Sequence, residues 1–240
     1  MRIAVLSDIH SNLPALEAVM RDMERIDQVW VLGDVVGYGP HPNQVIAALQ
    51  SVGARTVLGN HDGAAIGTVD PKDFNPDAGR AIAWTGTAID DNARSYLSAL
   101  PEVRTDGDLT AVHGSPRDPI WEYVTSSQIA ALNFKAFETR VCFFGHTHLP
   151  VVFRLDDDTV RTVQVTPGQP VELDSKRCLI NPGSVGQPRD GDPKSSYLVL
   201  DTEQATLDYR RVAYDVEATQ RAMRDVGLPP RLVERLSYGR

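Results

Sequence analysis

The sequence has no long apolar run and only two cysteines among its 240 residues. The first apolar run, "IAVL", stops at Ser7-Asp8 and is too short for a signal-peptide core or a membrane span. Cys142 and Cys178 show no C-x-x-C spacing, which favours buried free thiols in a reducing compartment and leaves a disulfide open. We therefore expect a cytoplasmic protein without a membrane partner.

An excess of positive charge is also missing. Lysine and arginine number 24 against 32 aspartates and glutamates, so the net charge is −8. This balance argues against a broad nucleic-acid surface or an anionic membrane surface. It leaves room for a small phosphorylated substrate, because bound cations can reverse the charge of one local site. A homo-oligomer stays open.

Apolar patterning predicts an α/β fold. In the first 60 residues, β-type runs at 2–8, 28–34 and 54–60 alternate with helix-spaced segments at 13–24 and 42–50, which indicates βαβ units. Further helices are expected at 77–89, 91–100, 126–138, 216–226 and 231–236, and a hairpin with Asp106-Gly107 as its turn. Strand-like runs dominate from residue 150 to 214. We expect one domain over residues 1–240, with two sheets.

Polar residues follow five of the predicted strands directly. Ligands bind at the carboxyl ends of strands in open α/β sheets, so these residues should form one rim. Five of the six histidines belong to it. The rim residues are Asp8, His10, Asp34, Asn60, His61, Asp62, His113, His146 and His148.

The rim residues have the chemistry of a metal site. In an extended segment, residues i and i+2 point the same way, so Asp8 with His10, and His146 with His148, could each donate two ligands. Seven candidate ligands offer carboxylate, imidazole and amide groups but no thiolate: Asp8, His10, Asp34, Asn60, His113, His146 and His148. This set favours Mn²⁺, Fe, Zn²⁺, Ni²⁺ or Mg²⁺ in an open site. Seven ligands exceed the need of one ion, so two ions sharing a carboxylate are expected.

The ordered motifs D-x-H, G-D, G-N-H-D, H-G and G-H-x-H, over residues 8–148, resemble the calcineurin-like metallophosphoesterase superfamily. "NPGS" at 181–184 is similar to its small bacterial and archaeal phosphoesterase branch. The resemblance implies a four-layer αββα sandwich of two mixed sheets flanked by helices. It also implies that one ion is held by Asp8, His10, Asp34 and His148, and the other by Asp34, Asn60, His113 and His146. Among the metals, manganese is the first expectation.

The same resemblance suggests a mechanism, in which a metal-bridging hydroxide attacks phosphorus. His61 would be the general acid, because the family motif places it beside the metals without ligating them. Asp62 would accept a hydrogen bond from the other ring nitrogen of His61, or would instead cap the following helix.

Two features bear on the substrate. Protein phosphatases of the superfamily follow G-D with a phosphate-gripping arginine, which "GDVVGYG" lacks. We therefore favour phosphodiesters or nucleotide-like substrates, with a phosphomonoesterase or protein phosphatase as the alternative. A non-catalytic metal-binding scaffold is the third interpretation, and the retained His61 argues against it. Asn12 and Arg189 are the candidate substrate contacts, with a solvated loop arginine as the alternative for Arg189. His41 is expected on the surface. Tyr38 either lines the substrate site or packs in the core.

Overall fold

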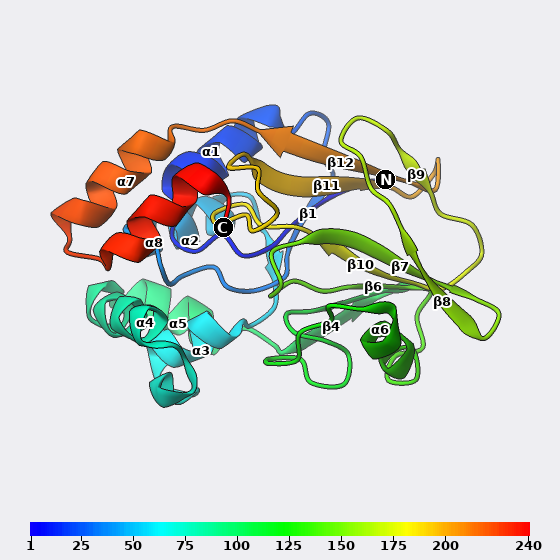
Figure 1. The fold of residues 1–240 in the computed structure, drawn as a ribbon, viewed down its shortest axis with the longest axis horizontal. Helices are drawn as coiled ribbons and strands as arrows, with labels where there is room; N and C mark the ends of the chain where they lie inside the picture. Colours follow the sequence, from blue (N-terminus) through cyan, green and yellow to red (C-terminus); the bar gives the residue numbers. More distant parts are fainter.

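The computed structural model describes residues 1–240, whose strands form two six-stranded mixed sheets (Figure 1). In the first sheet the order is β3-β2-β1-β11-β12-β9. Its strands are β1 (Arg2–Leu6), β2 (Gln28–Val31), β3 (Arg55–Thr56), β9 (Val171–Glu172), β11 (Ser195–Asp201) and β12 (Thr206–Val212). Strands β1 to β3 run parallel and the remaining pairs are antiparallel. The parallel part contains the βαβ units that the sequence predicts.

The second sheet has the order β4-β5-β6-β10-β7-β8. Its strands are β4 (Val103–Asp106), β5 (Leu109–Val112), β6 (Val141–Phe143), β7 (Pro150–Asp156), β8 (Thr159–Val163) and β10 (Cys178–Pro182). Strands β5, β6 and β10 are parallel. Their carboxyl ends therefore meet at one edge, as those of β1 to β3 do in the first sheet.

The core between the sheets follows from strand alternation. In β1, Ile3 and Val5 point into the space between the sheets, where Trp30 meets Phe143 edge-on at 6.4 Å between ring centroids. The alternate residues of the same strand point to the other side, toward helices. Both faces of β1 are thus buried, which explains its continuous apolar run.

Helices complete the layers. The outer face of the first sheet is covered by α1 (Leu13–Asp22), α2 (Pro42–Ser51) and α5 (Asp91–Ser98). The outer face of the second sheet is covered by α6 (Ser127–Asn133), which lies apart from the other helices in Figure 1. The predicted four-layer αββα sandwich is therefore confirmed.

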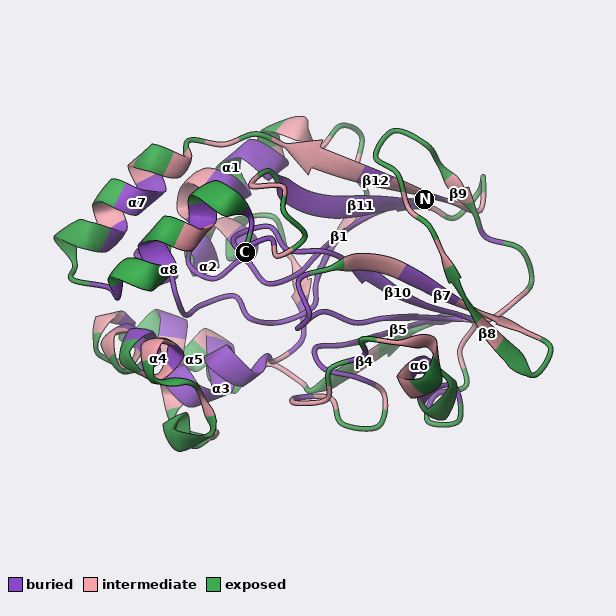
Figure 2. Ribbon diagram, in the orientation of Figure 1, coloured by how far each residue is buried: buried purple, intermediate pink, exposed green.

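The remaining helices lie toward the carboxyl ends of the parallel strands. They are α3 (Asn60–Ile66), α4 (Pro76–Ala88), α7 (Val216–Asp225) and α8 (Pro230–Arg235), with short 3-10 turns at Pro71–Asp73 and Leu236–Tyr238. Helices α4, α7 and α8 pack together around Tyr38. Figure 2 shows that each of these helices carries both buried and exposed residues. None of the helices has the length and apolar character that crossing a membrane requires.

Local chemistry sets the helix starts. Side chains of Asn75, Asp90, Ser126 and Asp215 each accept a hydrogen bond from a backbone N–H of the first turn. The β-type run expected at 54–60 is shorter in the structure: β3 covers only Arg55–Thr56, and the helix that Asp62 was considered to cap already begins at Asn60. The hairpin turn was misplaced by one residue: Asp106 pairs with Leu109, so Gly107 and Asp108 form the loop. Both cysteines are buried and unpaired.

Candidate metal centre

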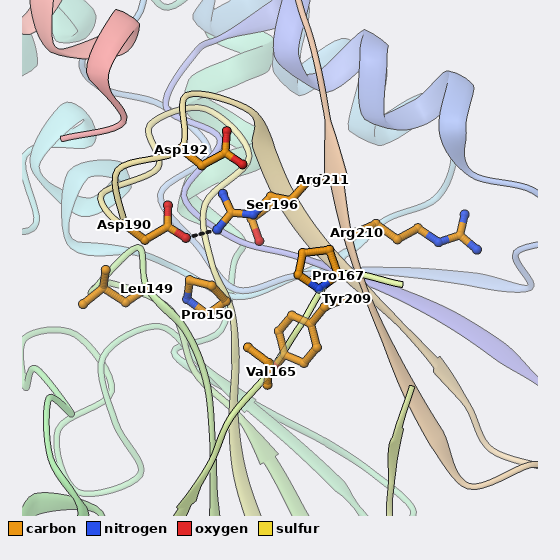
Figure 3. A pocket seen from close by; sticks show the side chains of 10 residues that line it. All are labelled: Leu149, Pro150, Val165, Pro167, Asp190, Asp192, Ser196, Tyr209, Arg210 and Arg211. Carbon is orange, nitrogen blue, oxygen red and sulfur yellow. Dashed lines mark hydrogen bonds and ion pairs between the residues drawn. The ribbon is translucent and has the colours of Figure 1, made fainter. Parts of the chain in front are cut away.

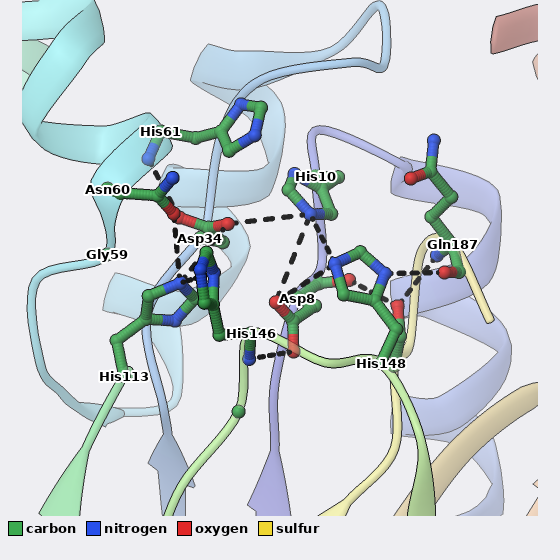
Figure 4. A network of polar contacts seen from close by, with 12 residues as sticks. Asp8, His10, Asp34, Gly59, Asn60, His61, His113, His146, His148 and Gln187 are labelled. Carbon is green, nitrogen blue, oxygen red and sulfur yellow. Dashed lines mark hydrogen bonds and ion pairs between the residues drawn. The ribbon is translucent and has the colours of Figure 1, made fainter. Parts of the chain in front are cut away.

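The seven candidate ligands lie together at the carboxyl ends of the parallel strands of both sheets (Figure 4). Asp8 and His10 follow β1, Asp34 follows β2, and Asn60 opens α3. His113 follows β5, while His146 and His148 follow β6. All seven residues are at most 3% exposed. The sandwich therefore brings them into one buried cluster.

One group consists of Asp8, His10 and His148. Nδ1 of His10 lies 3.1 Å from the carbonyl oxygen of Val36, and Nδ1 of His148 lies 2.6 Å from that of Gln187. A carbonyl only accepts, so each Nδ1 carries the proton and each Nε2 presents a lone pair. These two Nε2 atoms are 3.2 Å apart, and Oδ1 of Asp8 lies 3.2 Å from Nε2 of His148 without a hydrogen-bond partner. Three electron pairs thus converge on a point that a cation fits.

The second group is built in the same way. Nδ1 of His113 donates to the carbonyl oxygen of Leu32 at 2.8 Å, so Nε2 presents a lone pair whenever the ring is neutral. That Nε2 lies 3.0 Å from both Oδ1 of Asn60 and Nδ1 of His146, and 3.4 Å from Oδ2 of Asp34. Imidazole, amide and carboxylate atoms again converge, which is a donor set suited to a divalent ion.

Asp34 lies between the two groups. Its Oδ2 is 3.6 Å from Nε2 of His10 and 3.4 Å from Nε2 of His113. Its Oδ1 accepts the backbone N–H of His61 at 2.9 Å, which fixes the orientation of the carboxylate. One carboxylate thus faces ligands of both groups.

The ionisation of the metal-free cluster reflects the same crowding. Burial raises the pKa of Asp8 to about 7, and the charge of Asp34 adds to this. The pKa of Asp34 is held below its usual range, because His113 and His61 outweigh the effect of burial. Burial alone would lower the pKa of His113, but Asp34 raises it to about 9. A proton on His113 therefore offsets the charge of Asp34, as a bound cation would.

The backbone at these positions differs from the expected extended form. Asp8, His10, Asp34, His146 and His148 all have left-handed φ values, between 49° and 64°. Such a conformation costs about 1–3 kcal/mol for a non-glycine residue and persists only where packing fixes it. Consequently His146 and His148 lie in different groups, the division that the family resemblance implied and that i and i+2 spacing alone did not. His146 faces His113, and His148 faces Asp8.

Gly59 allows the close approach of α3 to Asp34. A Cβ atom at this position would lie 2.2 Å from both the backbone nitrogen and Oδ1 of Asp34. No side chain fits there, so glycine is required by contact rather than by backbone angle.

The carboxylate of Asp62 does not form a hydrogen bond with the ring of His61. Its carboxylate accepts the backbone N–H of Gly59 at 3.0 Å and that of Val36 at 2.9 Å. Because Asp62 is the third residue of α3, its side chain reaches back to the helix start. Of the two roles considered for Asp62, the structure shows the one at the start of the following helix and no hydrogen bond to His61. Asp62 also ties the start of α3 to the loop after β2.

His61 lies beside the cluster with its imidazole Nδ1 buried and without a hydrogen-bond partner. Burial lowers the pKa of His61 to about 4, against the opposing charge of Asp34, and Arg189 lowers it further. The resting ring is therefore neutral at pH 7. His61 also lies close enough to His10 and Asp34 to form a third potential ligand group.

A cavity of about 90 Å³ opens beside the cluster. Its walls include Asp34, His61, His146 and His148, together with Arg189. Nη2 of Arg189 donates to Oε1 of Gln187 at 3.3 Å, and its Nε has no hydrogen-bond partner. The structure thus places Arg189 where the sequence analysis expected a substrate contact.

The other predicted substrate contact, Asn12, is corrected by the structure. Its Nδ2 donates to the carbonyl oxygen of Gly186 at 2.9 Å, and its Oδ1 accepts from Oγ1 of Thr219 at 2.9 Å and from the backbone N–H of Ala15. Asn12 therefore caps α1 and joins distant segments. His41 precedes α2 and does not line the cavity.

The loop that carries Arg189 is anchored from its far side (Figure 3). Asp190 forms an ion pair with Arg211 of β12, and the N–H of Gly191 donates to the carbonyl oxygen of Gly239 at 2.9 Å. The ion pair borders a separate cavity of about 370 Å³ that is lined by none of the rim residues. This cavity therefore lies beside the Arg189 loop and outside the metal centre.

Three aromatic residues at the small cavity, Phe74, Trp121 and Tyr123, were not predicted. They lie on loops away from the strand-end motifs, so no spacing rule pointed to them. Tyr38 was expected either to line the substrate site or to pack in the core. It does both: it lines the cavity and packs in a core cluster.

A buried Asp/His cluster at the carboxyl ends of a two-sheet sandwich is the arrangement of a metal-dependent hydrolase. The model of the calcineurin-like phosphoesterase superfamily domain matches residues 1–205. The chain belongs to this superfamily, as its motifs predicted, and is a metal-dependent hydrolase of phosphoric esters.

Individual relatives agree with this assignment. The crystal structure of a metallophosphoesterase from Sphaerobacter thermophilus matches with a TM-score of 0.92 and 46% identity over 100% of both chains. An uncharacterised protein of Methanocaldococcus jannaschii is 35% identical, over 99% of this chain and 98% of its own. A symmetrical bis(5'-nucleosyl)-tetraphosphatase of Pectobacterium carotovorum is 30% identical over 54% of this chain and 48% of its own length. That last match spans about half of each protein.

Proposed function

We propose that this phosphoesterase uses two divalent metal ions, manganese first among the candidates, to hydrolyse phosphodiesters or nucleotide-like substrates. The main support for this proposal is the position of Asp34. Its Oδ2 lies within 3.6 Å of Nε2 of His10 in one ligand group and of Nε2 of His113 in the other. One ion would be held by Asp8, His10, Asp34 and His148. The other would be held by Asp34, Asn60, His113 and His146.

The orphaned atoms of the cluster support this proposal. Buried polar atoms normally have partners, yet Asp8 Oδ1 and His146 Nε2 have none. The facing Nε2 atoms of His10 and His148 cannot hydrogen-bond to each other while both rings are neutral and carry their proton on Nδ1. When bound, two divalent ions would bring the pKa of a water molecule close to neutral and offset the charge that develops on phosphoryl oxygens.

Arg189 and His61 have distinct roles in the proposal. Arg189 would donate to a phosphoryl oxygen in the cavity, because its Nε has no partner within the protein. His61 would donate to the leaving oxygen. Since its resting ring is neutral, His61 provides one N–H, and full proton transfer needs the negative charge of a bound phosphoryl group to raise its pKa.

Two observations bear on the substrate class. The arginine that grips phosphate in protein phosphatases of the superfamily is absent from "GDVVGYG". Part of the chain also resembles proteins named as symmetrical bis(5'-nucleosyl)-tetraphosphatases. Both points favour a nucleotide-like ester. A phosphomonoesterase or protein phosphatase remains the alternative, and a scaffold without activity is disfavoured because His61 and all seven candidate ligands are present together.

A substrate panel with each divalent metal tests the proposal. It contains bis-p-nitrophenyl phosphate, p-nitrophenyl phosphate, a dinucleoside polyphosphate, a cyclic nucleotide and a phosphopeptide. We expect the diester and nucleotide substrates to give the higher kcat/KM. A clearly higher value for the monoester or phosphopeptide would reverse the assignment, and no turnover with any metal would favour the scaffold.

A further inference from the structure

Aromatic rings surround the small cavity in an almost unbroken arc. Tyr38 lies 4.4 Å from His61 between ring centroids, and Phe74 lies 4.9 Å from both His61 and Trp121. The arc continues to Tyr123, which stacks on His146 at 3.8 Å with an interplanar angle of 26°. Aromatic residues form only 7% of the chain. Their concentration around one cavity therefore requires an explanation beyond general packing.

Tyr123 is the member that a ligand can reach. One face of its ring packs on His146, yet the residue is 45% exposed. A large aromatic residue with one face supported and the other open is suited to stacking against a planar group. Trp121 lines the cavity beside it, 6.3 Å from His146.

The loop holds both rings firmly. Between them, Oε2 of Glu122 accepts from Oγ of Ser115 at 2.6 Å and from Nδ2 of Asn133 at 2.7 Å, and the carboxylate pairs with Arg117. Directly after Tyr123, Val124 is 1% exposed and packs in the cluster between the second sheet and α6. The platform is thus preorganised, which reduces the entropy lost when a ligand binds.

We propose that Tyr123 and Trp121 form a stacking platform for the nucleobase of a small nucleotide whose phosphate lies at the metal centre and Arg189. This inference rests on the proposed function and specifies its substrate class. The cavity wall supplies a guanidinium for phosphate and an aromatic surface for a planar group. The net charge of −8 and the small cavity volume favour a free nucleotide over a nucleic acid.

Binding measured by calorimetry on the metal-loaded protein tests the platform directly. The probes are adenosine 5'-monophosphate, ribose 5-phosphate and phenyl phosphate, with product analysis to show whether any is hydrolysed. Base–aromatic stacking predicts that the nucleotide binds about tenfold more tightly than ribose 5-phosphate. Tyr123→Ala should bring this ratio close to one, while Tyr123→Phe should keep it.

Controls separate stacking from other roles of Tyr123. Leu132→Ala removes a 50% exposed apolar side chain from α6, outside the cavity, and should keep the ratio. Metal content measured on each variant shows whether loss of the ring disturbs His146. Loss of metal together with equal weakening of nucleotide and ribose 5-phosphate would mean that Tyr123 only covers His146, and would overturn the platform.

Two further results are decisive. Equal affinities of the wild type for the nucleotide and ribose 5-phosphate would overturn the inference even if the protein hydrolyses phosphodiesters. A gain for phenyl phosphate without one for the nucleotide would also overturn it, in favour of small aryl esters. Conversely, a nucleotide preference that depends on Tyr123, without hydrolysis of any substrate, would support the platform and refute the proposed catalysis.

Discussion

The Nε2 atoms of His10 and His148 face each other at 3.2 Å, although the Nδ1 atom of each ring already donates to a backbone carbonyl. Two neutral rings in these tautomers present lone pairs to one another, and Oδ1 of Asp8 approaches the same point. In the metal-free protein these buried lone pairs face one another without a hydrogen-bond donor, which lowers the stability of the fold. A cation between the three atoms would convert the repulsion into coordination, so metal binding and stability should be linked.

Metal binding should stabilise the protein more at high pH. The pKa of Asp8 is raised to about 7 by burial, and that of His113 is raised to about 9 by Asp34 against the effect of burial. Both lie above the unfolded values, so the stability they contribute to the metal-free protein is lost as pH rises through about 7 and 9. Ligation needs both groups deprotonated. The rise in Tm on adding Mn²⁺ should therefore be larger at about pH 8.5 than at about pH 5.5; an equal rise would contradict this.

His61→Ala should separate proton donation from metal binding. The variant should lose about 10²–10⁴-fold in kcat on a diester with a poor leaving group. The loss should shrink for p-nitrophenyl esters, because p-nitrophenolate leaves with little need of a proton. Metal content should stay near that of the wild type.

His148→Ala is the matched comparison, since it removes a candidate ligand that is 2% exposed. It should lose metal and activity together for every substrate. If His61→Ala also loses metal in proportion to activity, His61 is a ligand with His10 and Asp34, and another group must serve as the acid.

Gly59→Ala should damage the metal centre from outside the ligand set. The added methyl group would lie 2.2 Å from the backbone nitrogen and Oδ1 of Asp34, so α3 or the carboxylate must move. We expect at least a tenfold loss of metal affinity, of the order found when groups that support ligands are changed. Gly79→Ala is the control: its Cβ would lie 3.6 Å from the carbonyl oxygen of Pro71, and it should bind metal normally. Normal metal affinity in Gly59→Ala would show that Asp34 tolerates displacement.

The sequence predicted the rim well because each motif is local and follows its own apolar strand. It could not predict contacts that depend on distant segments. Asn12 forms hydrogen bonds with Gly186 and Thr219, which lie 174 and 207 residues away in the chain. Asp62 accepts a hydrogen bond from the backbone N–H of Val36, in the loop after β2 and 26 residues earlier. The left-handed backbone at His146 and His148 likewise arises from packing, and it sends the two rings to different groups.

The aromatic arc shows a second kind of limit. Phe74, Trp121 and Tyr123 have no fixed spacing from the ligand motifs and carry no chemistry that marks them in a sequence. Only the fold brings them to one cavity with His61 and Arg189. Specificity was therefore less predictable than metal chemistry.

A titration of activity against metal equivalents per chain, with bound metal measured by elemental analysis, tests the two-metal site most directly. The wild type should gain activity until two ions are bound, and chelation should abolish it. Asp34→Asn should bind both ions weakly and lose activity, because one carboxylate faces both groups. Asp91→Asn, an exposed carboxylate in the first turn of α5, should behave as the wild type. Full activity without metal, or Asp34→Asn with two tightly bound ions and normal turnover, would contradict the two-metal site.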